Sequence, residues 1–110
     1  MQFANSCLAE LKPGNIVRVR RILYWHYGIF CGENKIVHLT SYPNHIWQTG
    51  AEVKMTSIYE FLKSSNKIEV FCYSDTKSYR IVKNAYERLG ERKYSIFKYN
   101  CRHFVLSCAE

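Results

Sequence analysis

Several features common in other classes of protein are missing from this sequence, and each absence excludes a class of protein. No stretch approaches the roughly 18 consecutive apolar residues that a transmembrane helix needs. The first ten residues contain no hydrophobic run, so no secretory signal peptide is expected. Repeats, low-complexity segments and linkers are also absent, which predicts a single domain over residues 1–110.

Cysteine spacing argues against a disulfide framework and against a zinc site. The chain has five cysteines, an odd number, and no CxxC pair. Together with the lack of a signal peptide, this usage indicates free thiols in a reducing compartment, so a cytoplasmic protein is expected. The cysteines and histidines do not form the close pairs that bind zinc, and neither a metal nor a cofactor is expected.

What the sequence does contain is a large apolar fraction and an excess of positive charge. Hydrophobic residues make up 47% of the chain, which is enough for one core. Sixteen Lys and Arg residues against nine Asp and Glu residues leave a net charge of +7, which favours anionic partners. The basic residues are scattered, without an arginine-rich tract, so specific nucleic-acid binding is not expected. Peripheral contact with an anionic membrane fits this charge as well, although a soluble surface with spare lysines is favoured over either kind of partner.

The residue pattern predicts an α+β fold with a mostly antiparallel sheet and packed helices. A type II turn at Lys12-Pro13-Gly14-Asn15, with Gly at the φ > 0 position, opens the first strand. Strands are expected at Ile16–Ile22, Tyr24–Cys31, Lys35–Thr40, Ile68–Tyr73 and Tyr94–Tyr99, with a loop over Ser41–Glu52. Helices are expected from a capping box at Ser57 to Lys63, over Thr76–Leu89, and from Asn100 onward. The middle helix has an apolar stripe made of Tyr79, Val82, Ala85, Tyr86 and Leu89.

Cys101 is the first candidate for chemistry. Asn100 is a good helix N-cap, which places Cys101 in the first turn of the last helix. The positive end of a helix stabilises a thiolate, and the thiolate is the nucleophilic form of cysteine. However, Cys101 also shares one helical stripe with Phe104, Val105 and Cys108, and by spacing alone a packing role in the core is favoured.

A thiol nucleophile needs a base within hydrogen-bond reach, and a third group usually orients that base. His26 and His38 lie in adjacent predicted strands. His45 lies in the predicted loop, where a solvated surface role is expected. His103 follows Cys101 by two residues on a helix, and such residues point apart, so His103 is expected to be structural.

The turn between the two strands decides whether His26 and His38 share a face. A two-residue turn at Glu33-Asn34 would place them on opposite faces of the sheet. A three-residue loop, Gly32-Glu33-Asn34, would pair Gly28 with His38 and make the two histidines diagonal neighbours on one face. Gly32 and Asn34 suit the φ > 0 positions of that longer loop. The longer loop is therefore the one that makes a histidine pair.

Three segments together carry a resemblance to a known family. They are Leu11-Lys12-Pro13-Gly14 before a strand, the histidine segments Trp25-His26-Tyr27-Gly28-Ile29 and Val37-His38-Leu39, and the box Asn100-Cys101-Arg102-His103-Phe104-Val105. In this order they resemble the lecithin:retinol acyltransferase-like family. That family includes small phospholipase/acyltransferases, bacterial relatives and the H-box/NC proteins of some picornaviruses.

The resemblance implies a fold and a set of roles. The fold would be a circularly permuted papain-like one. Cys101 would be the nucleophile, His26 its general base, His38 the residue that orients the base, and Tyr24 a residue near the oxyanion. The substrate would be a phospholipid or another acyl-bearing molecule, whose acyl group passes through a thioester to water, an amine or a second lipid.

The sequence departs from the family pattern at three places. Arg102 stands where the family usually has Glu, which bears on charge near the nucleophile. Tyr27 stands where many members have Trp, and the sequence stops at Glu110 without the C-terminal hydrophobic anchor of membrane-bound vertebrate members.

Two alternatives to a lipid acyltransferase or phospholipase therefore stay open. One is a thiol amidase or peptidase, and the other is a catalytically idle interaction module that binds protein, RNA or membrane through an aromatic loop with Tyr42 and Trp47.

Overall fold

The described part of the chain folds into one sheet and three α-helices. The computed structural model describes residues 1–22, 24–41, 51–63, 65–93 and 100–110. The strands are β1 (Ala4–Ser6), β2 (Ile16–Arg20), β3 (Trp25–Phe30), β4 (Lys35–Ser41), β5 (Ala51–Ser57), β6 (Ile68–Phe71) and β7 (Arg92–Lys93). The helices are α1 (Ile58–Leu62), α2 (Asp75–Glu87) and α3 (Cys101–Cys108), and a short 3-10 helix, η1, spans Leu8–Glu10.

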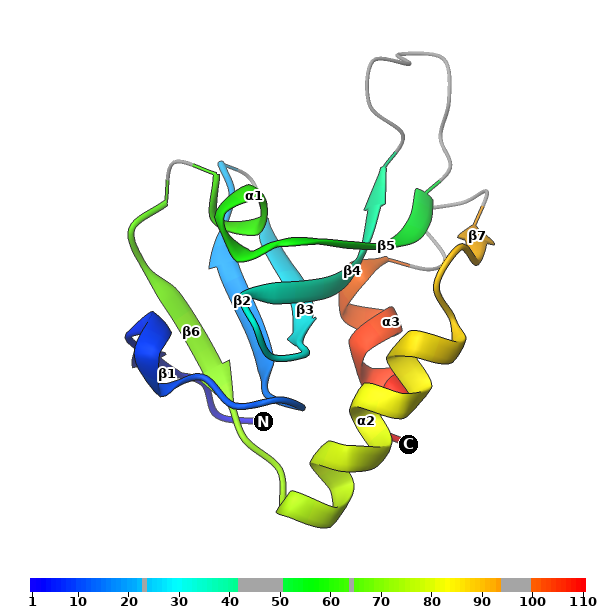
Figure 1. Cartoon of the computed structure of the whole chain (residues 1–110). Helices are drawn as coiled ribbons and strands as arrows, with labels where there is room; N and C mark the ends of the chain where they lie inside the picture. The colour runs from blue at the N-terminus through cyan, green and yellow to red at the C-terminus, as the bar shows by residue number, and fades with distance from the viewer. Residues whose placement is uncertain (23, 42–50, 64, 94–99) are drawn as a thin grey trace.

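The strands form a single antiparallel sheet in the order β1-β6-β2-β3-β4-β5-β7. Helices α2 and α3 pack side by side along the sheet, as Figure 1 shows. The predicted α+β class is confirmed, with a mostly antiparallel sheet and packed helices. The arrangement is compatible with the papain-like fold that the resemblance implies.

Strand alternation divides the core between the two faces of the sheet, because successive side chains of a strand point to opposite sides. On one face, α2 and α3 cover a cluster that includes Ile29 and Phe104. On the other face, α1 covers a cluster that includes Phe30 and Phe61. The central strands β3 and β4 contribute side chains to both clusters, so they are buried on both sides.

The β3–β4 hairpin has the three-residue loop that pairs the histidines. Cys31 N–H donates to the Lys35 carbonyl oxygen at 2.9 Å, and Ile29 lies opposite Val37 in the ladder. Gly32, Glu33 and Asn34 have φ of 91°, 52° and 60°. This left-handed run matches the loop predicted from the sequence, and the Ile29–Val37 and Phe30–Ile36 pairs give the register in which His26 and His38 share a face.

The turn that precedes β2 fixes how closely α2 approaches the sheet. Asn15 N–H donates to the Lys12 carbonyl oxygen at 3.0 Å, and Gly14 has φ of 92°, as the predicted type II turn requires. A Cβ at Gly14 would lie 2.4 Å from the Cβ of Ser78 on α2. Only a small residue on each side allows this contact.

That close approach explains why the second helix is present as predicted but buries only part of the predicted apolar stripe, with Ala85 in the core and Val82 half-buried. The face of α2 that meets the core carries Ser78, Ile81 and Ala85. Tyr79, which the stripe placed inward, is 74% exposed, and Tyr86 and Leu89 are exposed as well. Serine packs where the helix touches the Gly14 turn, whereas the tyrosines extend their rings and hydroxyl groups along the surface.

Three strands were not predicted, and each has a weak sequence signal. The short β1 and β7 lie at the two edges of the sheet, and β5 begins inside the predicted loop over Ser41–Glu52. Segment Ala51–Ser57 contains Glu52 and Lys54, which dilute its apolar alternation, although Ala51 and Val53 are buried. The predicted strand at Tyr94–Tyr99 lies outside the described residues.

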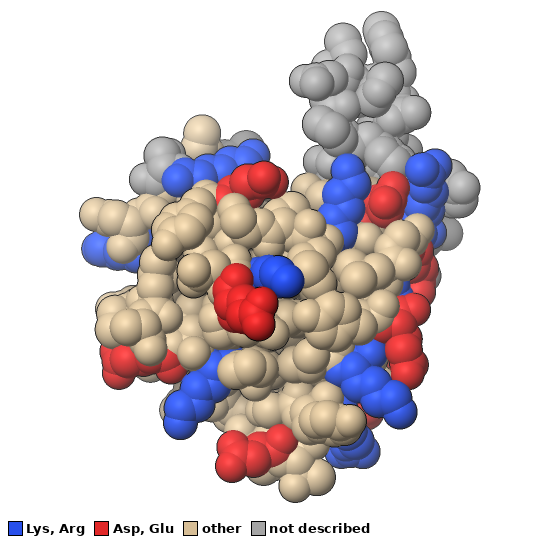
Figure 2. Space-filling model, viewed as in Figure 1, with Lys and Arg blue, Asp and Glu red and all other residues tan. Residues whose placement is uncertain are grey.

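The charged residues visible in Figure 2 are dispersed. Basic and acidic groups alternate with uncharged surface on this face, and no stripe of one sign crosses it. Among the helices of the described residues, none combines the length and apolar character needed to cross a membrane.

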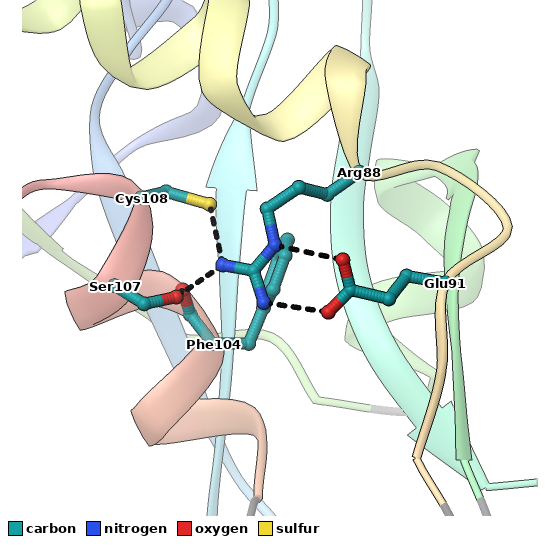
Figure 3. A network of polar contacts seen from close by, with 5 residues as sticks. All are labelled: Arg88, Glu91, Phe104, Ser107 and Cys108. Atoms are coloured by element: carbon teal, nitrogen blue, oxygen red, sulfur yellow. Dashed lines mark hydrogen bonds and ion pairs between the residues drawn. The ribbon is translucent and has the colours of Figure 1, made fainter.

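A network around Arg88 ties the end of α2 to α3. The Arg88 guanidinium donates to both carboxylate oxygens of Glu91, at 2.9 and 3.2 Å, and to the hydroxyl of Ser107 on α3. It also lies 3.8 Å from the Cys108 sulfur and 5.0 Å from the centre of the Phe104 ring, as Figure 3 shows. Because Cys101 lies at the other end of α3, this network holds the helix that carries the nucleophile candidate.

We predict that Arg88→Met destabilises the fold by about 1–3 kcal/mol, since the substitution removes several charge-assisted hydrogen bonds from a half-buried site. Lys35→Met is the matched control. Its partner Glu33 is 87% exposed and lies 3.7 Å away, and exposed pairs contribute less than about 1 kcal/mol. Urea unfolding of both variants measures the difference, and equal unfolding free energies would contradict this role of Arg88.

Candidate active site

A cavity of about 500 Å³ reaches Cys101 at the start of α3. Its walls come from the beginning of β3, from β4 and β5, and from the first turn of α3. The lining residues that matter for chemistry are Tyr24, Trp25, His26, Asn100, Cys101 and Arg102. Three of the residues predicted for the site, Cys101, His26 and Tyr24, therefore border one space.

The cavity forms where β3 separates from β4. Their ladder covers Ile29–Val37 and Phe30–Ile36 only, whereas β4 and β5 pair along the whole of β4. Cys31 directs its N–H toward β4, and alternate residues of a strand direct their backbone groups to the same side. The backbone groups of Trp25 and Tyr27 therefore face the opening rather than a partner strand.

The thiol of Cys101 occupies this gap in the ladder. Its Sγ lies 3.8 Å from the Trp25 carbonyl oxygen, to which it donates. Asn100 caps α3 as predicted, with its side-chain oxygen accepting from His103 N–H at 3.1 Å. Cys101 is half-buried, while Phe104, Val105 and Cys108 further along the same stripe are buried in the core. Only the first cysteine of the stripe is thus open to a ligand.

The lower thiol pKa expected at the start of a helix is wrong for Cys101, whose pKa is raised. Burial raises the pKa of Cys101 above its ordinary value. Hydrogen bonding to the backbone of Tyr27, Arg102 and Cys101 itself acts in the opposite direction, and so does the charge of Arg21. The resting thiol is therefore protonated at neutral pH, and it needs a base to become a nucleophile.

His26 and His38 form a buried pair on the α1 face of the sheet. His26 Nε2 lies 2.8 Å from His38 Nδ1, and the side chains are 7% and 5% exposed. The ring of Phe61 packs against both imidazoles, with centroid distances of 5.2 and 5.3 Å. Gly28 makes room for that ring, because a Cβ there would lie 2.8 Å from Phe61.

Thr56 on β5 sets the direction of the hydrogen bonds. Its hydroxyl donates to the Ser57 carbonyl oxygen at 3.2 Å, so its oxygen accepts from His38 Nε2–H at 2.9 Å. His38 Nδ1 then carries a lone pair and accepts from His26 Nε2–H. This pattern assigns the protons of both rings and leaves Nδ1 of His26 as the basic nitrogen.

Burial also controls the charge of the pair. It lowers the pKa of His26, and the neighbouring His38 and the cations Arg21 and Lys63 lower it further. The pKa of His38 is lowered by burial first, then by Arg21, Lys54 and Lys63. Both imidazoles are therefore neutral at pH 7, which is the form in which His26 accepts a proton.

His26 and Cys101 do not hydrogen-bond in the resting structure, since the thiol is directed at Trp25. The two side chains reach the cavity from opposite faces of the sheet, His26 from the α1 face and Cys101 from the α3 face. The opening between β3 and β4 is what lets them border the same space. A rotation of the thiol away from Trp25 is the movement that would bring it toward His26.

The other predicted residues are placed as follows. Tyr24 is 54% exposed, lines the cavity and lies edge-on to His26 with ring centroids 6.3 Å apart. His103 accepts from Asn100 N–H at 3.4 Å and completes a capping box, which agrees with a structural role. His45, Tyr42 and Trp47 lie outside the described residues. No group of three or more metal-ligating side chains occurs in the part of the chain that the structure describes.

Sequence reasoning missed Thr56 and Arg21. Thr56 lies on a strand that was predicted only as loop and helix cap, so no facing partner for His38 could be inferred. Arg21 lies just after β2 and donates to the Phe61 carbonyl oxygen at 2.7 Å. Its place five residues before His26, across the β2–β3 turn, was the only available signal.

Two buried neutral histidines make stability depend on pH, and we predict the sign. Both folded-state pKa values lie below the ordinary 6.5, so the unfolded chain binds more protons as pH falls from 6.5 toward 4. The contribution of the two neutral histidines to the unfolding free energy is thus present above pH 6.5 and is lost as the pH falls below it. From pH 7.0 to 5.5 the wild type should lose about 2 kcal/mol more unfolding free energy than a His26→Asn/His38→Gln variant. Urea unfolding at both pH values tests this, and equal losses would contradict it.

A known family and several known proteins are similar to this chain over most of its length. Residues 9–110 match the lecithin retinol acyltransferase family. Human phospholipase A and acyltransferase 4 is 28% identical over 112 residues, which cover 87% of this chain and 68% of that protein. Human phospholipase A and acyltransferase 3 is 29% identical over 115 residues, covering 89% and 70%, and the mouse protein of the same name is 26% identical over 116 residues, covering 89% and 70%. The chain therefore belongs to the lecithin retinol acyltransferase family.

Proposed function

We propose that the protein is a thiol-dependent phospholipase A and acyltransferase that works through an acyl-Cys101 intermediate. The observation that carries this proposal is the cavity bordered by Cys101 and by His26, whose basic nitrogen is set by His38 and Thr56. Family membership and the names of the relatives support the reaction class. The five cysteines are unpaired, and a reducing cytoplasm would keep the Cys101 thiol available.

The first half-reaction transfers the acyl group to the enzyme. His26 Nδ1 takes the thiol proton of Cys101, and the sulfur attacks the carbonyl carbon of the lipid ester. The oxyanion that forms lies near the backbone N–H groups at the start of α3, with Tyr24 on the same cavity. The ester C–O bond then breaks, the lysolipid oxygen takes the proton back from His26, and a thioester remains on Cys101.

The second half-reaction removes the acyl group. Water, an amine or a second lipid enters the vacated part of the cavity and loses its proton to His26 Nδ1. The new bond forms at the thioester carbonyl, the C–S bond breaks, and the sulfur regains its proton from His26. In both halves His38 accepts from His26 Nε2–H, which orients the ring and favours its charged form when the proton arrives.

We also propose that the turn after β2 contacts an anionic membrane. Ile22 is 92% exposed there, and Arg20, Arg21 and Lys63 line a groove of about 590 Å³ beside it. An apolar tip flanked by cations suits an interface of anionic headgroups and acyl chains. Tyr24 lines both this groove and the Cys101 cavity, so contact at the turn would bring lipid next to the nucleophile.

We predict an acyl adduct on Cys101 when the protein meets phospholipid vesicles that contain some anionic lipid. Acid quenching and mass spectrometry of the Cys101 peptide detect the thioester. Cys101→Ala should lose the adduct and at least about 10³-fold of lysolipid release. Cys72→Ala is the matched control, because Cys72 is an exposed thiol outside the cavity, and it should retain both signals.

Other outcomes would redirect the assignment. An adduct from an acyl amide but not from phospholipid would replace lipid chemistry by amidase chemistry. An adduct on Cys72 with none on Cys101 would indicate nonspecific acylation and overturn the proposal. No adduct from any acyl donor would favour an interaction module that does no chemistry.

A further inference from the structure

A second cavity shares His26 with the first cavity, but Cys101 is not among its lining residues. Its volume is about 260 Å³, and its walls include both histidines. Three cations from different elements converge on it: Arg21 after β2, Lys54 on β5 and Lys63 at the end of α1. Glu60 is the one carboxylate among its lining residues, so the cations outnumber it.

These three cations have no carboxylate partner among the described residues. The ion pairs between described residues join Arg18 to Glu69, Lys35 to Glu33, Arg88 to Glu91, and Arg92 to Glu52. Arg21 is held in place by its bond to the Phe61 carbonyl oxygen, which uses one of its five N–H donors. The remaining donors and two ammonium groups are left to bind an anion at the cavity.

The backbone at Lys63 is also unusual. Lys63 has φ of 54° and ψ of −120°, a conformation that favours glycine and costs a residue with a Cβ about 1 kcal/mol or more. Its N–H closes α1 by donating to the Tyr59 carbonyl oxygen. Glycine would fit this position with less strain, so lysine at position 63 makes the local backbone less stable than glycine would.

The two cavities are neighbours with common walls, since Tyr24 and His26 line both of them. A molecule that passes over Tyr24 and His26 would place one group at Cys101 and another among the cations. In a glycerophospholipid, the acyl ester and the phosphate are joined through a single glycerol unit. Arg and Lys are the side chains that bind phosphate oxygens with charge-assisted hydrogen bonds.

We propose that Arg21, Lys54 and Lys63 form a subsite for the phosphate of the lipid headgroup, while the acyl ester of the same molecule lies against Cys101. This assignment rests on the proposed function. The charges of all three cations already reach the histidines, as their effects on the pKa of His38 show, though burial is the larger cause. A bound phosphate would offset those charges next to the base.

The kinetic test compares a phospholipid with a neutral acyl ester of the same chain length, both in nonionic micelles. The ratio of kcat/KM for the phospholipid over the neutral ester should fall about tenfold in Lys54→Gln and in Lys63→Gly, mainly through KM, if each cation contributes one charged hydrogen bond. Lys83→Gln is the control, since it removes the same charge from the exposed side of α2 and should leave the ratio unchanged. An equal fall in all three variants would mean general electrostatic attraction and would overturn the subsite.

Stability separates a binding effect from a folding effect. Lys63→Gly should raise the unfolding free energy while it lowers the ratio, because glycine relieves the positive φ. A lower ratio accompanied by lower stability in this variant would contradict the proposal.

Binding is tested independently of turnover. Titration with glycerophosphocholine should shift the backbone amide signals of Lys54 and Lys63 in an NMR spectrum, and Lys54→Gln should weaken the shifts. Shifts with inorganic phosphate alone would contradict headgroup recognition, and shifts with neither would overturn the phosphate site. If the wild type turns over neither ester, the proposed function fails, while the glycerophosphocholine titration still decides the subsite.

Discussion

The hydrogen bond between His26 Nε2 and His38 Nδ1, 2.8 Å long, connects two buried strands at the point where their backbones separate. It depends on the three-residue loop after β3, since a two-residue turn would put the rings on opposite faces. It also depends on Phe61, whose ring packs against both imidazoles, and on Thr56, which fixes the direction of the protons. Without these contacts, two neutral histidines buried in the core would destabilise the fold.

The same separation of β3 and β4 makes the site accessible from the opposite face. The backbone of Trp25 and Tyr27 has no partner in β4, and Cys101 at the start of α3 fills that place. The helix is held from its far end by Arg88, which links α2, Ser107 and Cys108. The proposed base, His26, from one face and the proposed nucleophile, Cys101, from the other thus border one cavity at a break in the pairing of β3 with β4. This geometry requires long-range packing that no local segment contains.

The parts of the fold that follow from local chemistry were predicted from the sequence. Gly14 and Gly32 indicated turns that need a positive φ, which glycine adopts without strain, and Asn100 indicated the start of α3. The Gly32–Asn34 loop then identified the histidine pair. What failed depended on contacts between distant segments. The buried face of α2 is set by the contact between Gly14 and Ser78. Strand β5, which carries Thr56, forms because it pairs with β4 along the whole of that strand.

The central claim is that this chain of hydrogen bonds leaves Nδ1 as the unprotonated nitrogen of His26, a residue that lines the cavity. Long-range proton–nitrogen NMR correlation of the imidazole rings at pH 7.5 measures this directly, because the two tautomers have different nitrogen shifts. The account predicts that His26 and His38 both carry their proton on Nε2, and that Thr56→Val weakens this preference at both rings. A proton on Nδ1 of His26 in the wild type would contradict the account, since that nitrogen could not then accept the proton of Cys101.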